Sequence, residues 1–368
     1  MHSEEWTRFD YGSEHPLRME RLGLTWRLME AYGLTAAPGT LVRAPEAADE
    51  AALRTFHTEE YLDVLRAANS GQAPGLVGRY GLGPGDNPVF PGLWDAARLV
   101  AGGSLLAARL VAGGTVERAF HFAGGLHHAM ADRASGFCYV NDAVLAILYL
   151  RAQRLRVAYV DVDAHHGDGV QAAFYGDPNV LTISTHERGD RLFPGTGFVE
   201  EMGAGEGYGF AVNLPLDVLT DPSVYHPAFD AVVLPLLHAF QPDVVVAQLG
   251  IDSHRTDPLT HLALDVQGFA EAVRKIVAAA PRLVALGGGG YDLENVARAW
   301  TAAWAVMAGV DLPEEIPASF FEHARSFRSR SLWDPAVEID ADHVHRAREY
   351  ASRQVDAVQR LIFPRHGL

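Results

Sequence analysis

Five short apolar runs, each ending at polar residues that can do chemistry, constrain the fold of this chain more than any other feature. The runs cover residues 119–122, 157–160, 180–183, 244–249 and 283–286. Continuous apolar strands separated by helical stretches are typical of a parallel sheet covered by helices on both faces. Ligand sites in such sheets lie outside the carboxyl ends of the strands. The sequence therefore predicts an α/β fold in which five polar clusters meet at one edge.

No linker, low-complexity tract or internal repeat divides the chain. Its 368 residues fit two ordinary domains or one large α/β domain. Without a linker, a single domain over residues 1–368 is the simpler prediction. Apolar residues at helical spacing from 344 to 362 predict a final helix. We expect residues 310–368 to be peripheral and to pack on the outside.

The acidic charge of the chain limits its partners. The sequence has 46 Asp and Glu against 30 Lys and Arg, a formal net charge of −16. Nucleic acid is not an expected partner, because binding to a phosphate backbone depends on Lys and Arg. An acidic surface instead attracts cationic ligands such as lysine-rich peptides or polyamines, although many acidic faces only confer solubility.

The sequence carries no signal for export or for a membrane. No uncharged apolar run reaches the roughly eighteen residues that a membrane helix needs, and the first residues lack the pattern of a signal peptide. The single cysteine, Cys138, rules out an internal disulfide. We expect a cytoplasmic protein without a membrane partner. A nucleophilic Cys138 beside a histidine is the alternative to a buried, inert thiol, which is the more common case.

Carboxylates and an imidazole follow the second and fourth runs in a pattern that suits a metal ion. Asp161, Asp163 and His165 alternate, so they share one face if the strand persists. Asp252 ends a buried run, where a carboxylate is unfavourable unless a cation or metal pairs with it. Two carboxylates and one imidazole without thiolate suit zinc or another divalent ion. For the Asp161–His165 stretch alone, a structural hydrogen-bond cluster is the alternative.

Two adjacent histidines, His127 and His128, follow the first run and a pair of glycines. Two imidazoles can serve as an acid and a base. The plainer interpretation is that they bind loop carbonyls. Asp161 and Asp168 are candidate carboxylate partners, which would fix the imidazole tautomers and tune their pKa values.

Four glycines at 287–290 and Tyr291 follow the last run. They do not form a phosphate loop, because Asp292 occupies the place of the last glycine in GxGxxG and no Gly-Lys-Ser/Thr follows. Glycines let the backbone approach a ligand closely, and Tyr291 beside them could donate to a developing oxyanion. A glycine turn with a packed tyrosine is the alternative.

Several of these stretches, in this order, closely resemble the arginase-like histone deacetylase family. They are GGLHHAMADRASGFCYVNDAVLAI, YVDVDAHHGDGVQAAFYGDPNVLTIS, LFPGTG with GAGEG, GIDSHRTDPL and LGGGGYDLENVARAW. The likeness runs from about residue 11 to 304, and the early YGSEHPLRMERL and HTEEYLDVLR stretches look like the bacterial acetoin-utilisation branch. The resemblance implies a single open, mainly parallel eight-stranded sheet with helices on both faces and a narrow tunnel leading to zinc.

The resemblance implies that Asp163, His165 and Asp252 hold zinc, with iron(II) as the alternative ion in the cell. It also implies potassium ions near the zinc. The residues that would hold potassium are Asp161, Asp163, His165, Ser184 and Thr185 at one site, and Phe174 and Val180 at a second.

The catalytic residues of the family fall on His127, His128, Asp161, Asp168 and Tyr291. The resemblance implies that His128 is the general base, backed by Asp168, and that His127 is its electrostatic partner, backed by Asp161. Tyr291 matches the tyrosine that donates to the oxyanion. The implied reaction is hydrolysis of the acetyl amide of N-ε-acetyl-lysine in a protein or peptide, with release of acetate.

The substrate-contacting positions of the family fall on Asp86, Gly136, Phe137, Phe193, Leu259, Gly289 and Gly290. Phe137 and Phe193 would form the tunnel walls and Leu259 its rim. The Gly136 carbonyl would accept the amide proton of the substrate, and Asp86 would grip the peptide backbone.

Two other functions compete with protein deacetylation. The same chemistry could act on acetylpolyamines or another small acyl amide. A protein that binds acyl-lysine without catalysis is a weaker hypothesis, because every catalytic position of the family is present.

Overall fold

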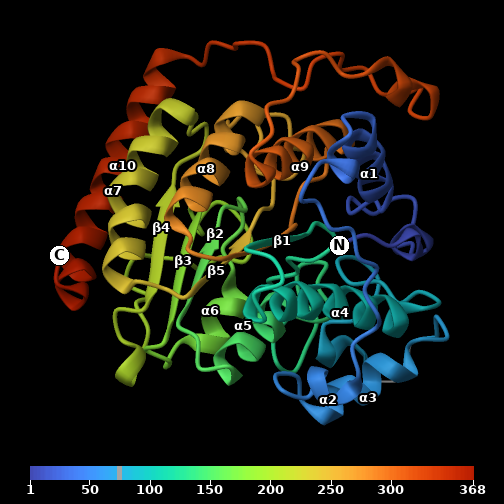
Figure 1. Ribbon diagram of the computed structural model, residues 1–368. Helices are drawn as coiled ribbons and strands as arrows, with labels where there is room; N and C mark the ends of the chain where they lie inside the picture. Colours follow the sequence, from blue (N-terminus) through green and yellow to red (C-terminus); the bar gives the residue numbers. More distant parts are fainter. Residues whose placement is uncertain (73–76) are drawn as a thin grey trace.

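A six-stranded parallel sheet forms the centre of the protein (Figure 1). The computed structural model describes residues 1–72 and 77–368. The strand order is β1-β6-β5-β2-β3-β4, and every pairing is parallel. The strands are β1 (Arg118–His121), β2 (Val157–Asp161), β3 (Val180–Glu187), β4 (Ala211–Leu216), β5 (Val244–Gln248) and β6 (Leu283–Leu286).

Helices cover both faces of this sheet. Figure 1 shows α4, α5 and α6 on one face and α7, α8 and α9 on the other. The α/β class and the parallel sheet that the sequence predicted are therefore confirmed. The helices are α1 (Glu20–Ala31), α2 (Glu50–Leu53), α3 (Glu59–Ala67), α4 (Leu93–Ala112), α5 (Asp142–Ala152), α6 (Asp168–Phe174), α7 (Pro222–Phe240), α8 (Val266–Ala279), α9 (Leu293–Ala308) and α10 (Ala341–Leu361).

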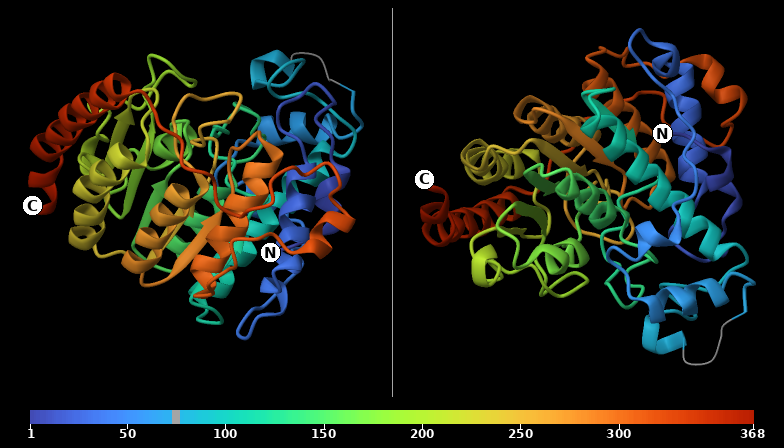
Figure 2. Two further views of the ribbon diagram at one scale, coloured as in Figure 1. Left: turned by 90° about the horizontal axis from the view of Figure 1, so that it is seen from above. Right: turned by 60° about the horizontal axis from the view of Figure 1, so that its bottom comes forward.

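The prediction of eight strands is wrong, since the described residues form six. Both edges of the sheet are occupied by other parts of the chain. At one edge α10 packs against β4 and α7 (Figure 2). At the other edge the Met1 amino group donates to the carbonyl oxygen of Phe120 in β1 at 2.5 Å. A covered edge offers no free ladder to a further strand.

The register of the central strands places polar residues side by side. Asp161 at the end of β2 is paired with Gln248 of β5 and with Ser184 of β3. Every residue of β2, β3 and β5 is buried, as expected for strands covered on both faces. The polar side chains at their carboxyl ends are therefore close together and shielded from water.

The last part of the chain runs over the outside of this framework. After α9 it forms the short helix η5 (Ala318–Glu322) and then α10, which lies beside α7 in both views of Figure 2. Buried side chains of α10, such as Val358, belong to the same hydrophobic core as Trp6 near the N-terminus. Among the described residues, no helix combines the length and the apolar character needed to cross a membrane.

Candidate metal centre and active site

Asp163, His165 and Asp252 meet at the carboxyl edge of the sheet. Asp163 and His165 follow β2, and Asp252 follows β5. One donor atom from each lies within 4.8 Å of the others, and all three residues are buried. His165 Nδ1 is 2.8 Å from Asp252 Oδ2 and 3.1 Å from Asp163 Oδ1. These residues, which the sequence predicted as zinc ligands, form the one such cluster found in the described part of the chain.

The charge balance of this cluster favours a bound cation. Two buried carboxylates face a single imidazole, and burying unbalanced charge is unfavourable. Burial and the neighbouring charge of Asp163 raise the pKa of Asp252 above its usual value. A divalent ion would balance both carboxylates at once. The donor set lacks a thiolate, so it fits a catalytic zinc or a similar ion with an open position for water.

Other groups orient the two carboxylates. Asp163 Oδ2 accepts from Gln248 Nε2 and from the Gly289 amide, both at 2.8 Å. Asp252 Oδ1 accepts from the Ala164 amide at 2.7 Å. Hydrogen bonds of this kind to metal-ligating groups fix their orientation. Gln248 is a site residue that the sequence analysis missed. The signal was its place in the same buried run as Asp252.

Two glycines leave room for the carboxylates. A Cβ atom on Gly250 would overlap Asp163 Oδ2, and one on Gly289 would overlap Asp252 Oδ2. The close backbone approach that the glycine run predicted therefore occurs, and at Gly289 it is directed at the ligand carboxylates. Gly290 instead packs against Ile251 and Val296. A substrate-binding role for Gly289 and Gly290 stays a prediction.

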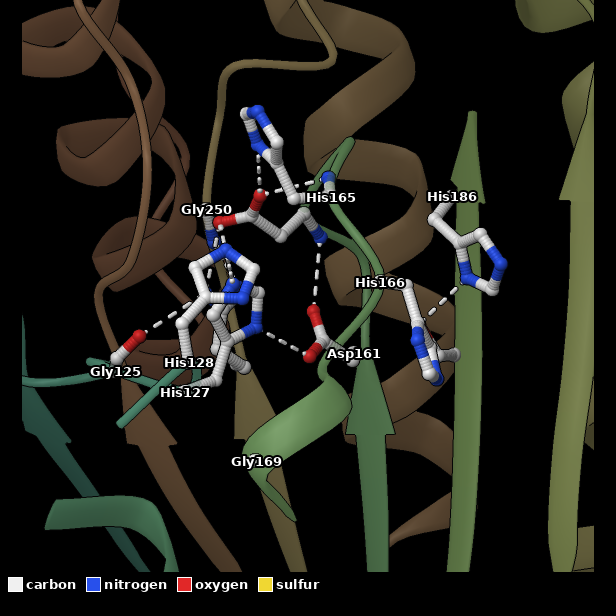
Figure 3. Close-up of polar contacts among 12 residues, drawn as sticks. Gly125, His127, His128, Asp161, His165, His166, Gly169, His186 and Gly250 are labelled. Carbon is white, nitrogen blue, oxygen red and sulfur yellow. Dashed lines mark hydrogen bonds and ion pairs between the residues drawn. The ribbon is translucent and has the colours of Figure 1, made fainter. Parts of the chain in front are cut away.

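The histidine pair lies beside the carboxylate cluster. His127 Nδ1 is 2.8 Å from Asp161 Oδ2, and His128 Nδ1 is 2.7 Å from Asp168 Oδ1. The two Nε2 atoms are 3.0 Å apart. Figure 3 shows His127 facing Asp161, with the His165 ring above the histidine pair. The two histidines thus have the carboxylate partners that the sequence predicted.

The surroundings of the two imidazoles separate their pKa values. Burial by itself lowers the pKa of His127, but the carboxylates of Asp161 and Asp163 outweigh it and raise the pKa to about 9. Burial and the positive charge of His127 lower the pKa of His128 to about 4. The surroundings therefore favour the charged form of His127 and the neutral form of His128. The roles of general base and electrostatic partner for the two histidines stay predictions.

A carboxylate from α5 holds the loop that carries the histidines. Asp142 accepts from the amides of Gly125 and Leu126 at 2.9 and 2.8 Å and from Ser104 Oγ at 2.5 Å. It is fully buried. The sequence analysis missed this residue, although it quoted the stretch that contains it. A charged residue at the start of an apolar helix was the available signal.

A small cavity beside the carboxylates joins several of the predicted residues. Its lining includes His127, His128, Gly136, Phe137, Cys138, Asp163, His165, Gly289 and Tyr291. The rings of Phe137 and Tyr291 meet edge to face with centroids 5.7 Å apart. Burial, with the charges of Asp252 and Asp163, raises the pKa of Tyr291, so the phenol stays a donor. Burial also raises the pKa of the Cys138 thiol, which argues against a nucleophilic role.

Two further side chains hold the backbone of residues 288–291 in place. Arg21, buried in α1, donates through Nη1 to the carbonyl oxygens of Gly288 and Gly290 at 2.9 and 3.0 Å. Asp257 Oδ2 accepts from the Tyr291 amide at 2.8 Å. The sequence analysis named neither Arg21 nor Asp257 as a site residue. A single arginine in a helix gives no signal of this contact.

Some of the residues predicted for the substrate passage lie around the histidines, and others lie on loops outside the cavity. The Phe193 ring is 5.0 Å from the His128 ring and 43% exposed. The Asp86 carbonyl oxygen is 3.2 Å from His15 Nε2, and the His15 ring packs on Phe137 at 4.6 Å. Asp86 and Leu259 do not line the cavity described above. Both lie on loops, and their roles as rim residues stay predictions.

The residues predicted to hold potassium have protein partners. Ser184 Oγ is 2.7 Å from His186 Nδ1, and Thr185 Oγ1 donates to the Asp161 carbonyl at 3.1 Å. Phe174 and Val180 lie at the end of α6 and the start of β3. Val180 is thus at the amino end of β3, away from the metal cluster. Both potassium sites stay predictions.

The sequence of this chain is similar to a known protein family and to several of its members. The family model described as the histone deacetylase domain matches residues 15–307. The acetoin utilization protein AcuC of Bacillus subtilis (strain 168) is 40% identical over 325 residues, which cover 86% of this chain and 84% of that protein. Human histone deacetylase 1 is 39% identical over 317 residues, which cover 85% of this chain and 65% of that protein.

Solved structures agree with the sequence relatives. The crystal structure of an HDAC homolog complexed with SAHA superposes with a TM-score of 0.88 at 31% identity, covering 96% of this chain and 97% of that one. The structure of an HDAC homolog from Aquifex aeolicus gives a TM-score of 0.87 at the same identity and coverage.

We predict that Gly250→Ala weakens binding of a divalent ion, because the added methyl group would displace the Asp163 carboxylate. The expected loss of affinity is on the order of tenfold or more, measured with Co²⁺ in competition with a chromophoric chelator. Gly176→Ala is the matched control, since its Cβ would meet only the Ala204 carbonyl oxygen at 3.8 Å. Equal Co²⁺ affinity in the two variants would show that the metal is not held at Asp163.

Proposed function

The chain belongs to the histone deacetylase family, and we propose that it is a zinc-dependent hydrolase of N-ε-acetyl-lysine in proteins or peptides. Members of this family are hydrolytic deacetylases, so the reaction class follows from membership. The observation that carries the finer proposal is the buried cluster of Asp163, His165 and Asp252 beside the histidine pair. This arrangement combines a site for a divalent ion with a neutral base.

Each side chain at the site has a separate role in the proposed hydrolysis. Zinc held by Asp163, His165 and Asp252 would supply Lewis-acid activation of water and of the acetyl carbonyl. His128 takes a proton from the attacking water at Nε2, because Asp168 already holds its Nδ1 side. His127, kept cationic by Asp161, stabilises negative charge as it develops.

The same residues complete the reaction. The Tyr291 phenol donates a hydrogen bond to the oxyanion of the tetrahedral intermediate. A histidine of the pair then protonates the leaving lysine amine, and acetate is the second product. The high pKa of Tyr291 supports this role, since only the protonated phenol can donate.

The substrate passage suits an acetyl-lysine side chain. The Phe137 and Phe193 rings lie near Tyr291 and His128 respectively and would flank the four-carbon stem. Gly136, which lines the cavity, would accept the amide proton of the substrate. Asp86 would bind the peptide backbone at the rim, and Leu259 would complete that rim. A net charge of −16 supports a cationic peptide over nucleic acid as a partner.

The cofactors and the compartment are further parts of the proposal. Zinc fits the Asp163–His165–Asp252 donor set, with iron(II) as the alternative in the cell. Potassium at Asp161, Ser184 and Thr185 is proposed from the family resemblance. The single cysteine supports a cytoplasmic protein, since disulfides are rare there. We propose a single domain over residues 1–368, supported by a hydrophobic core that extends from Trp6 to Ile362.

We predict that Tyr291→Phe lowers kcat about a hundred- to a thousandfold, because one donor to the oxyanion is lost. The assay is acetate release from an acetyl-lysine peptide at saturating substrate. The variant should fold, since the phenol oxygen makes no hydrogen bond within the described residues, and far-UV circular dichroism checks this. Full turnover by Tyr291→Phe would exclude the oxyanion role.

An acetylpolyamine is the second candidate substrate, favoured by the acidic charge of the chain. The two candidates differ at the rim, because only a peptide offers a backbone to Asp86. We predict that Asp86→Ala raises KM for an acetyl-lysine peptide several-fold and leaves turnover of acetylputrescine unchanged.

Glu14→Ala is the control, since Glu14 is an exposed carboxylate next to His15, whose ring contacts the Asp86 carbonyl oxygen. If Asp86→Ala left peptide turnover intact and the wild-type protein preferred acetylputrescine, the substrate would be the polyamine.

A further inference from the structure

We propose that Asp334, in the segment between η5 and α10, is a positioning residue that holds the Asp252 and Tyr291 region in place through His254. The inference rests on the proposed metal site, since it concerns the loop that supplies one of the three ligands. It assigns a role to a part of the chain that the sequence analysis took as peripheral. Asp334 also lies beyond residues 15–307, the range that the family model matches.

Asp334 is bound from three directions. Its Oδ2 atom is 2.8 Å from His254 Nε2 and accepts from the Val266 amide at 2.8 Å. Its Oδ1 atom is 2.8 Å from Arg298 Nη1 in α9. The side chains of Asp334, His254 and Arg298 are 6%, 2% and 5% exposed. A carboxylate so enclosed has little access to water in place of its partners, so each contact helps to fix its geometry.

The tautomer of the His254 ring follows from the partners of its two nitrogen atoms. Its Nδ1 atom accepts from the Thr256 amide at 3.2 Å and from Asn295 Nδ2 at 2.8 Å. An atom that accepts from a backbone amide carries no proton, so the ring proton is on Nε2 and is donated to Asp334. Asp334 therefore sets both the orientation and the tautomer of this imidazole.

The loop that starts at His254 leads directly to the site. The His254 amide donates to the Ile251 carbonyl at 3.1 Å, which closes a turn around Asp252. The Asp257 amide donates to the His254 carbonyl at 2.9 Å. Asp257 in turn accepts from the Tyr291 amide at 2.8 Å. A fixed His254 ring thus holds the turn that carries Asp252. Through Asp257, which the same loop carries, it also holds the backbone of Tyr291.

An ion pair connects α9 to the same hydrogen-bond network. Arg298 is buried, and Asp334 is the carboxylate that pairs with it. Arg298 Nη2 also donates to Asn295 Oδ1, and Asn295 donates to His254. Loss of Asp334 would leave the guanidinium buried without a counterion and the His254 proton without an acceptor. Both changes would loosen the loop that starts at His254, although Asp334 itself does not line the cavity.

The test compares Asp334→Ala and Asp334→Asn with the wild-type protein. We expect Asp334→Ala to weaken Co²⁺ binding on the order of tenfold and to change the visible d–d spectrum of the bound ion, because ligand geometry is altered. The kcat for an acetyl-lysine peptide should fall, with little change in KM, since Asp334 does not touch the substrate passage. Asp334→Asn keeps an acceptor for His254 and should give an intermediate effect.

Two controls separate positioning from general loss of stability. Asp243→Ala removes the carboxylate that accepts from the Arg156 amide at 2.8 Å, at the far end of β5 from Asp252. Glu338→Ala removes an exposed carboxylate of the same C-terminal segment. Neither should change the Co²⁺ spectrum, even if Asp243→Ala lowers the unfolding temperature.

Amide hydrogen exchange of the metal-free protein tests the positioning role of Asp334 without any measurement of activity. Amides of residues 251–262 and 288–292 should exchange faster in Asp334→Ala than in either control variant. Unchanged exchange and unchanged Co²⁺ affinity in Asp334→Ala would overturn the inference while leaving the proposed function intact. A wild-type protein that releases no acetate would instead overturn the proposed function, and the exchange result would still decide the role of Asp334.

Discussion

The burial of Asp163 and Asp252 around one imidazole is the interaction on which the rest of the site depends. Both carboxylates lie at the carboxyl ends of adjacent parallel strands, where the framework excludes water. Like charges so close together repel each other in a buried site, and a cation bound between them offsets that repulsion. Much of the surrounding structure serves this arrangement. Gln248 and the Gly289 amide donate to Asp163, and glycines at 250 and 289 leave space for the carboxylate oxygens.

The same carboxyl edge explains how two identical side chains acquire different functions. His127 and His128 are neighbours, yet the former lies against the buried carboxylates and the latter is turned toward the cavity and Phe193. Their pKa values are therefore raised and lowered respectively. Position alone thus favours a charged His127 beside a neutral His128, and acid–base catalysis uses pairs of groups whose pKa values are separated in this way.

The sequence predicted the parts of the fold that depend on local pattern. The five apolar runs became β1, β2, β3, β5 and β6, and polar residues that follow β1, β2, β5 and β6 meet at one site. The polar residues 184–186 after the third run lie within β3 itself and line neither the carboxylate cluster nor its cavity. The strand β4 (AVNLPL) was missed, because its proline and asparagine weaken the strand pattern. Contacts between distant segments left no local signal. Asp334 meets His254 across 80 positions, and Arg21 reaches Gly288 across 267. The number of strands had another origin, since eight strands were implied by the family resemblance, whereas the pattern gave five runs and the described residues form six strands.

The measurement that tests this account most directly is acetate release from an acetyl-lysine peptide, before and after chelation and again with zinc restored. If the cluster holds the catalytic ion, the metal-loaded protein releases acetate, release stops after the ion is removed, and it recovers when about one zinc per chain is added back. Release that persists at full rate in protein shown to be free of metal would contradict the central role of Asp163, His165 and Asp252.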